Sequence, residues 1–274
     1  MAATATYNGK LRIGAVTYLN AKPLTECLPE LAPRAALCFD LPSRLADELA
    51  AGRLDAALLP SIEAFRQPDC RVVSDACIAS DGPVRSVKLY SRVPVEQVRS
   101  LALDVGSRTS AAAVQILLRE RFGLRPAVVP LPIGAPAERA AADAVLLIGD
   151  RGMQPPPPEF AVEWDIGAQW AAWSGLPLVF ALWVARGGGE WPGLAAALAA
   201  ARDAGLRRAA EIAEREAPRV GLPAAECRAY LCEALCFRLG PRQRRGLERF
   251  HQLAVEHGLA PPGRQPAFVA DEGA

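Results

Sequence analysis

Short apolar runs alternate with helical patterns along the first part of the chain. Residues 11–16 and 55–59 are apolar runs of strand length, and residues 38–41 are a further strand candidate. A helix is expected to open at Pro42 and to end at Gly52, because glycine accepts the left-handed conformation found at helix ends. Strands that alternate with helices predict parallel sheets covered by helices on both faces.

The middle of the chain repeats this order of elements. Both copies end in a strand of the pattern Asp-Ala-x-Leu-Leu, which begins at Asp55 and again at Asp143. The duplication predicts two α/β lobes with mostly parallel sheets. The expected elements of the second copy are strands over residues 101–105, 127–131 and 143–148 and helices over residues 111–122 and 136–142.

Three more helices are expected to return to the first lobe, over residues 193–217, 223–239 and 243–257. The chain should cross between the lobes within residues 86–92 and again within residues 178–186. We therefore assign residues 1–92 and 187–274 to lobe 1 and residues 93–186 to lobe 2.

Polar residues follow several of the predicted strands. Ligands of open α/β sheets bind beyond the carboxyl ends of the strands, so these loops should face a ligand cleft between the lobes. The loops are residues 17–20, 60–61, 107–110 and 149–151.

Composition narrows the class of protein. The chain has 274 residues, 51% of them hydrophobic, and a formal net charge of +1, which excludes a disordered protein and a general nucleic-acid binder. No apolar run approaches the ~18 residues of a membrane span, and no basic start followed by an apolar stretch indicates export. Seven cysteines without C-x-x-C spacing indicate free thiols in the cytoplasm and no metal site.

Several catalytic motifs are absent from the sequence. No Gly-x-Gly-x-x-Gly, P-loop or Gly-x-Ser-x-Gly pattern occurs, and the two histidines, His251 and His257, lie close to the C-terminus. The side chains predicted to line the cleft are therefore hydroxyls, amides and arginines, and few of them could act as a base.

Three features of the loops suit anion binding or catalysis, and each has a simpler explanation. Ser107, Thr109 and Ser110 stand where a strand turns into a helix, a position that attracts anions but also favours ordinary N-cap residues. Asn20 is likewise a common N-cap. Ser86 lies in an apparent strand, where a plain surface position explains it equally well.

Six longer segments carry a family resemblance. They are residues 12–24 (RIGAVTYLNAKPL), 54–63 (LDAALLPSIE), 75–87 (DACIASDGPVRSV), 107–110 (SRTS), 147–151 (LIGDR) and 170–177 (WAAWSGLP). From about residue 11 to about residue 250 the chain resembles the chorismate dehydratases of the futalosine-dependent menaquinone pathway. The resemblance implies the fold of type II periplasmic binding proteins. It also implies loss of water from chorismate, a small dianion, to give 3-[(1-carboxyvinyl)oxy]benzoate, and no cofactor.

By motif position, the resemblance implies that Asn20 and Ser86 contact the reacting ring and the leaving hydroxyl. The expected substrate-binding residues are Ser61, Ser107, Arg108, Thr109, Ser110, Asp150 and Arg151. A carboxylate of the substrate could itself accept the proton, which would suit a cleft without a histidine or lysine base. The oligomeric state cannot be inferred.

Three other functions remain open. The later enzyme of the pathway, which releases 1,4-dihydroxy-6-naphthoate, shares the fold and is expected to use a cleft histidine, which the predicted second lobe lacks. A non-enzymatic solute-binding protein would normally be exported. A ligand-sensing domain of a regulator would usually carry a helix-turn-helix, and none is found.

Overall fold

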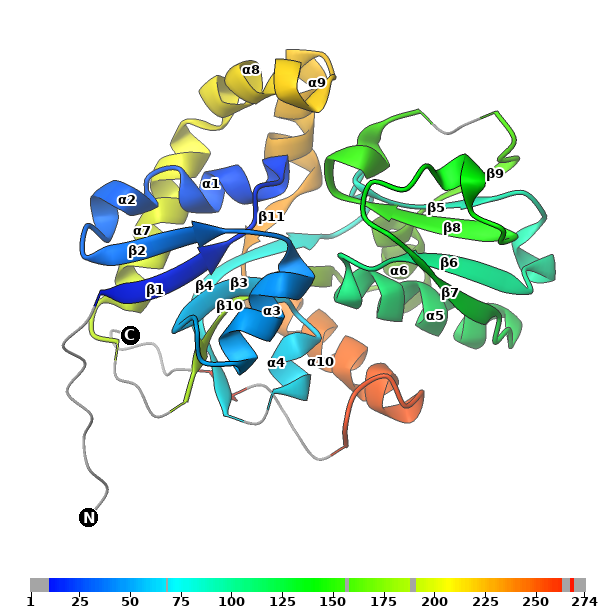
Figure 1. The fold of residues 1–274 in the computed structure, drawn as a ribbon, viewed down its shortest axis with the longest axis horizontal. Coiled ribbons are helices and arrows are strands. Elements are labelled where there is room, and N and C mark those ends of the chain that lie inside the picture. Colours follow the sequence, from blue (N-terminus) through cyan, green and yellow to red (C-terminus); the bar gives the residue numbers. More distant parts are fainter. Residues whose placement is uncertain (1–9, 68, 156–157, 188–190, 263–266, 269–274) are drawn as a thin grey trace.

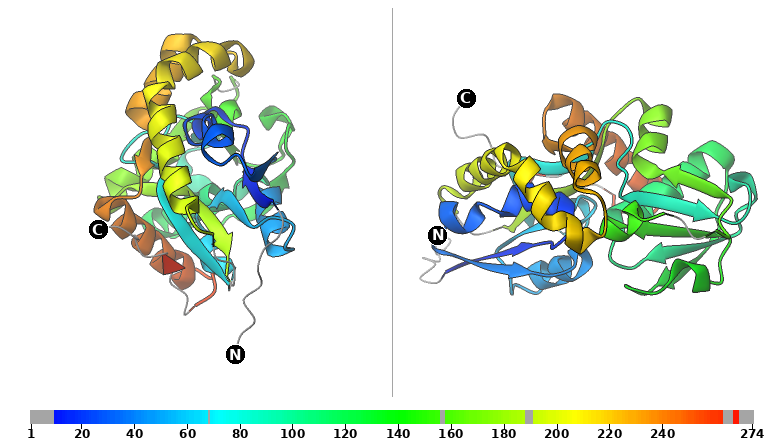
Figure 2. Two further views of the ribbon diagram at one scale, coloured as in Figure 1. Left: turned by 90° about the vertical axis from the view of Figure 1, so that its left-hand side faces the viewer. Right: turned by 90° about the horizontal axis from the view of Figure 1, so that it is seen from above.

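The computed structural model describes residues 10–67, 69–155, 158–187, 191–262 and 267–268. Two β-sheets, each flanked by helices, form two lobes that lie side by side (Figure 1). Seen from above in Figure 2, the green strands of the second sheet gather on one side and the blue and cyan strands of the first on the other.

The first sheet has the order β11-β4-β10-β3-β1-β2, and β12 pairs with β4. Its strands are β1 (Leu11–Ala15), β2 (Ala35–Phe39), β3 (Ala56–Pro60), β4 (Cys70–Ser80), β10 (Leu178–Arg186), β11 (Cys236–Arg238) and β12 (Ala267–Phe268). The helices of this lobe are α1 (Lys22–Thr25), α2 (Leu28–Leu31), α3 (Pro42–Ala50), α4 (Glu63–Arg66), α7 (Leu194–Arg207), α8 (Ala209–Val220), α9 (Ala224–Ala229) and α10 (Pro241–Glu256).

The second sheet has the order β7-β6-β8-β5-β9. Its strands are β5 (Val87–Ser91), β6 (Ser100–Asp104), β7 (Ala127–Leu131), β8 (Ala144–Ile148) and β9 (Val162–Asp165), and its helices are α5 (Arg108–Phe122) and α6 (Ile166–Ser174). Every residue of β3 and of β8 is buried, as expected for apolar strands covered on both faces. These two strands are the repeated Asp-Ala-x-Leu-Leu segments, so the duplication in the sequence corresponds to equivalent central strands.

The sheets are mixed, whereas mostly parallel sheets were expected. β1 runs parallel to β2 and β3, and β6 runs parallel to β7 and β8. The strands next to the crossings run the other way: β10 is antiparallel to β3 and β4, and β5 is antiparallel to β8 and β9. The reversal arises because each of these strands enters its sheet directly from the other lobe.

The predicted lobe boundaries are wrong at both crossings. β5 was assigned to lobe 1 but pairs within the second sheet, and β10 was assigned to lobe 2 but pairs within the first. A strand satisfies its backbone groups in one sheet, so the crossings fall in the loops before β5 and before β10. The first lobe therefore consists of the first sheet and its helices, and the second lobe consists of the second sheet and its helices.

Three expected helices differ from the prediction. Residues 136–142 form only a short 3₁₀ turn, and residues 193–217 are divided between α7 and α8. The segment predicted as one helix over residues 223–239 divides into α9, a π-helical turn (Tyr230–Ala234) and β11. Pairing of β11 with β4 accounts for the last change, because tertiary hydrogen bonds override a local helical pattern.

No helix in the described part of the chain is long and apolar enough to cross a membrane.

Candidate active site

A cleft with about 560 Å³ of empty space, partly open to solvent, lies between the lobes. It receives residues from the ends of β1 and β3 in the first lobe and from the loops after β6 and β8 in the second. Its polar lining residues are Tyr18, Asn20, Ser86, Ser107, Thr109 and Ser110, and the remainder are glycine, proline and apolar side chains. The cleft therefore forms where the carboxyl ends of the strands meet, as the sequence predicted.

Five of the nine predicted site residues line this cleft, and four do not. Asn20, Ser86, Ser107, Thr109 and Ser110 lie on its surface. Ser61, Arg108, Asp150 and Arg151 are absent from the lining and make other contacts, described below.

Asn20 lies in a 3₁₀ turn (Leu19–Ala21) that follows β1. Tyr18 and Ala21 occupy the N-cap positions of this turn and of α1, so Asn20 does not serve as an N-cap. Its Oδ1 atom is buried and has no hydrogen-bond partner among the described residues. An unpaired polar atom of this kind costs free energy unless a ligand satisfies it.

Ser86 precedes β5 at the crossing into the second lobe, and it is buried, which rules out the plain surface position. Its Oγ accepts a hydrogen bond of 2.7 Å from the hydroxyl of Tyr230. Tyr230 is a residue that sequence reasoning missed, because a single tyrosine inside an expected helix carries no signal of its own. Tyr18 was missed as a lining residue although it lies within the first motif.

The N-terminus of α5 opens onto the cleft. Ser107 is the N-cap residue, yet its side chain makes no capping hydrogen bond. Ala111 N is the first helix amide to find a partner, Ser107 O at 3.3 Å, and no partner within the described chain satisfies the amides of residues 108–110. These amides and the helix dipole give this end of the cleft a positive potential without a charged side chain.

Ser61 and Thr109 join the lobes beneath the cleft. The Ser61 hydroxyl donates to Val179 O at 2.6 Å, and Ser61 Oγ lies 3.3 Å from Thr109 Oγ1. Because the Ser61 hydrogen is committed to Val179, Thr109 must donate to Ser61, and Thr109 Oγ1 in turn accepts from Ile62 N at 3.2 Å. Thr109 therefore offers the cleft its backbone N–H, and fully buried Ser61 offers it no hydrogen.

The two candidate arginines are held by protein groups. Arg108 lies 2.7 Å from Asp47 and 3.2 Å from Glu63, which are carboxylates of the first lobe. Arg151 donates to Ala135 O at 2.6 Å and lies 3.7 Å from Asp104. Neither arginine lines the cleft, although Nη1 of Arg151 is buried without a hydrogen-bond partner among the described residues.

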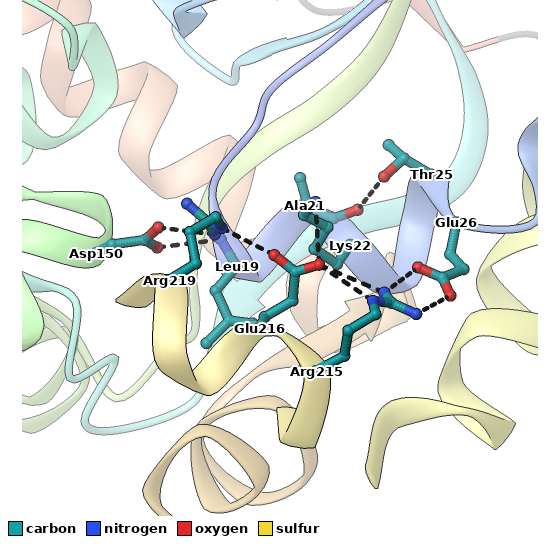
Figure 3. Close-up of polar contacts among 9 residues, drawn as sticks. All are labelled: Leu19, Ala21, Lys22, Thr25, Glu26, Asp150, Arg215, Glu216 and Arg219. Carbon is teal, nitrogen blue, oxygen red and sulfur yellow. Dashed lines mark hydrogen bonds and ion pairs between the residues drawn. The ribbon is translucent and has the colours of Figure 1, made fainter. Parts of the chain in front are cut away.

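Asp150 links the second lobe to the first, as Figure 3 shows. Its carboxylate accepts a hydrogen bond of 3.0 Å from Leu19 N and forms an ion pair of 3.0 Å with Arg219 on α8. Arg219 also pairs with Glu216 at 2.8 Å, and Glu216 lies 3.3 Å from Lys22, which begins α1. Asp150 thus fixes the turn that carries Asn20.

Burial has the largest effect on the pKa values of the two tyrosines at the cleft. Burial, with the Asp104 and Asp150 carboxylates nearby, raises the pKa of Tyr18 to about 12. Burial also raises the pKa of Tyr230, although its contacts with Ser86 and Asn20 lower it in part. Both phenols therefore stay protonated and can act as donors. None of the described residues that line the cleft has an acidic, basic or imidazole side chain.

The histidines lie elsewhere. His251 is buried against Phe65, with 4.2 Å between ring centroids, and His257 lies 2.7 Å from Glu120. Neither is a lining residue of the cleft.

Two mixed sheets with flanking helices around an interlobe cleft form a periplasmic-binding-protein-like fold. The fold is similar to a structure from Archaeoglobus fulgidus (TM-score 0.68, 13% identity, covering 92% of this chain and 99% of that one). It is also similar to the alkanesulfonate-binding protein of Xanthomonas axonopodis pv. citri (TM-score 0.60, 16% identity, 92% and 94%). A Candida albicans protein described as having the generic periplasmic binding protein fold also matches (TM-score 0.58, 12% identity, 93% and 92%).

Comparison of the sequence assigns the chain to a narrower group of proteins than the fold does. The profile of the menaquinone biosynthesis family matches residues 11–256. A curated chorismate dehydratase from Thermus thermophilus is 31% identical over 233 residues, which cover 77% of this chain and 83% of that protein. The chain belongs to the menaquinone biosynthesis family, and the fold and family that the motifs indicated are confirmed.

Proposed function

We propose that this protein is a chorismate dehydratase, which removes water from chorismate to give 3-[(1-carboxyvinyl)oxy]benzoate. The observation that carries the proposal is the convergence of Asn20, Ser86 and the N-terminus of α5 on one cleft whose lining has no charged side chain. A dianion that reacts by elimination needs fixed donors more than a protein base. The Thermus thermophilus relative supports this choice of substrate.

The substrate's carboxylates are proposed to bind at the start of α5. The free amides of residues 108–110 and the hydroxyls of Ser107 and Ser110 provide donors there, and the helix dipole favours negative charge. Arg108, Ser61 and Asp150 support this arrangement indirectly, since each holds one lobe against the other.

The proton is proposed to leave from the ring carbon that bears the enolpyruvyl ether. A carboxylate of the substrate accepts it, and the electron pair spreads through the diene into the ring carboxylate. The neighbouring carbon–oxygen bond then breaks and the ring becomes aromatic. The departing hydroxide takes up a proton, so one water is lost in all. Asn20 and Ser86 orient the ring and donate to the oxygen that leaves.

Incubation with chorismate tests the proposal directly. Loss of the diene absorbance, together with a product lighter by one water in the mass spectrum, would support it. Binding of chorismate without turnover would contradict it and favour a solute-binding protein. The naphthoate-forming reaction gains no support, because neither histidine lines the cleft.

We also propose that the protein is located in the cytoplasm. The seven cysteines are free thiols, from buried Cys77 to exposed Cys232, which suits a reducing compartment.

A further inference from the structure

Tyr230 stands at a junction of three parts of the chain. It begins the π-helical turn (Tyr230–Ala234) between α9 and β11, a segment that passes between the lobes in Figure 1. Its side chain is 1% exposed. Its hydroxyl donates to Ser86 at the crossing, and the phenol is also affected by the side chain of Asn20 after β1. One phenol therefore contacts both proposed catalytic residues.

The direction of the Tyr230–Ser86 hydrogen bond determines what Ser86 can do. The Tyr230 phenol is neutral, because burial raises its pKa, and it has a single hydrogen. That hydrogen is given to Ser86 Oγ at 2.7 Å. Ser86 is thereby the acceptor in this pair, and its own hydrogen must point to another atom.

A serine hydroxyl otherwise turns freely among its staggered positions. The backbone beside Ser86 is already held: Arg85 has a φ of 63°, a strained value for a residue with a side chain. The amides of Val84 and Arg85 donate to the Asp165 carboxylate at 2.9 and 2.7 Å. This clamp fixes the main chain, and the remaining freedom of Ser86 is the rotation that Tyr230 restricts.

We propose that Tyr230 is a positioning residue that holds the Ser86 hydroxyl as a donor toward the cleft, where it meets the hydroxyl that chorismate loses. This inference rests on the proposed function. Tyr230 does not line the cleft, so it acts through Ser86 and not on the substrate.

Tyr230→Phe tests this role, because it removes the hydroxyl and keeps the ring. We expect kcat to fall about 10- to 100-fold, less than the ~10²- to 10³-fold expected when a donor is removed, because the Ser86 hydroxyl remains and only its orientation is lost. The Kd for the product, 3-[(1-carboxyvinyl)oxy]benzoate, should stay within about twofold, because the helix amides that bind carboxylates are unchanged. Tyr90→Phe is the matched control: Tyr90 is equally buried and donates to Gln154 O at 3.2 Å in the second lobe.

A double-mutant cycle separates positioning from a general effect on the fold. In the Ser86→Ala background, measured by single turnover with excess enzyme, adding Tyr230→Phe should change the rate by less than about twofold. Equal losses in both backgrounds would overturn the inference, as would an unchanged kcat in Tyr230→Phe. If the wild-type protein leaves chorismate intact, the proposed function fails first, and this inference fails with it.

Discussion

Asp150, a residue of the second lobe, accepts a hydrogen bond of 3.0 Å from the backbone amide of Leu19 in the first lobe. The next residue after Leu19 is Asn20, whose buried Oδ1 has no partner among the described residues. Asp150 was predicted to bind substrate, but its carboxylate is used by Leu19 and Arg219. Closure of the lobes and placement of Asn20 therefore depend on the same carboxylate.

Replacing Asp150 with alanine should reduce kcat/KM about tenfold or more, because the turn carrying Asn20 loses its acceptor and small displacements of catalytic groups are costly. Steady-state kinetics with chorismate measure this effect. Glu163→Ala is the control, since it removes a carboxylate of the same lobe that pairs with Lys88 at 2.6 Å, away from the cleft. Equal kinetics for the two variants would show that the Leu19 contact has no catalytic role.

Asn20→Ala should lower kcat by about 10²- to 10³-fold, as expected when a donor or acceptor at the reacting centre is lost. The free energy of unfolding should change by about 1 kcal/mol or less, because Oδ1 has no partner among the described residues and only the side-chain contact with Tyr230 is lost. Thr17→Ala, an exposed change in the same loop, serves as the comparison. A wild-type kcat in the Asn20 variant would remove this residue from the mechanism.

Arg108→Met should affect stability and leave substrate binding nearly unchanged. The arginine pairs with buried Glu63, and loss of this partner should cost about 1–3 kcal/mol, lessened by the Arg66 ion pair of 3.1 Å. KM for chorismate should stay within about threefold. Denaturant titration and kinetics provide the two measurements. A large rise in KM at unchanged stability would return Arg108 to the substrate site.

Two glycines with left-handed backbones allow a matched test of the cleft wall. Gly149 has a φ of 65° and Gly123 a φ of 67°, so an alanine at either position should cost about 1 kcal/mol from strain. A Cβ at Gly149 would also lie 3.1 Å from the Tyr18 ring, whereas nothing lies within 4 Å at Gly123. Only Gly149→Ala should therefore lower kcat/KM, and equal activity in both variants would mean that Tyr18 tolerates displacement.

Acid should destabilise the fold through His251. Burial lowers the pKa of His251 below its ordinary value of about 6.5, so the unfolded chain binds the proton more readily than the native state. Stability should be unaffected above that value and should fall as the pH drops below it. Between about pH 8 and about pH 5.5, the Tm of the His251→Phe variant should fall less than the Tm of the wild type. Identical pH profiles for His251→Phe and the wild type would contradict the assignment.

The local patterns predicted the elements that form the two lobes. β1, β3, β6, β8 and α5 lie within a few residues of the predicted ranges. In contrast, β4 and β9 were not predicted, and β11 was expected to be helical. β4 is bounded on both sides by strands far away in sequence, and such partners leave no periodic signal in the segment itself.

The sequence by itself determined the duplicated α/β order, the family motifs and the loops that reach the cleft. Asn20 and the start of α5 followed from those loops, because the end of a strand fixes where the next residues lie, whereas Ser86 followed from its position in a family motif. Only the tertiary structure decided which polar side chains remain available there. It directs Arg108 to Glu63, Asp150 to Leu19 and Tyr230 to Ser86. The physical reason is that a side chain's partner depends on segments brought together by folding, which no local pattern encodes.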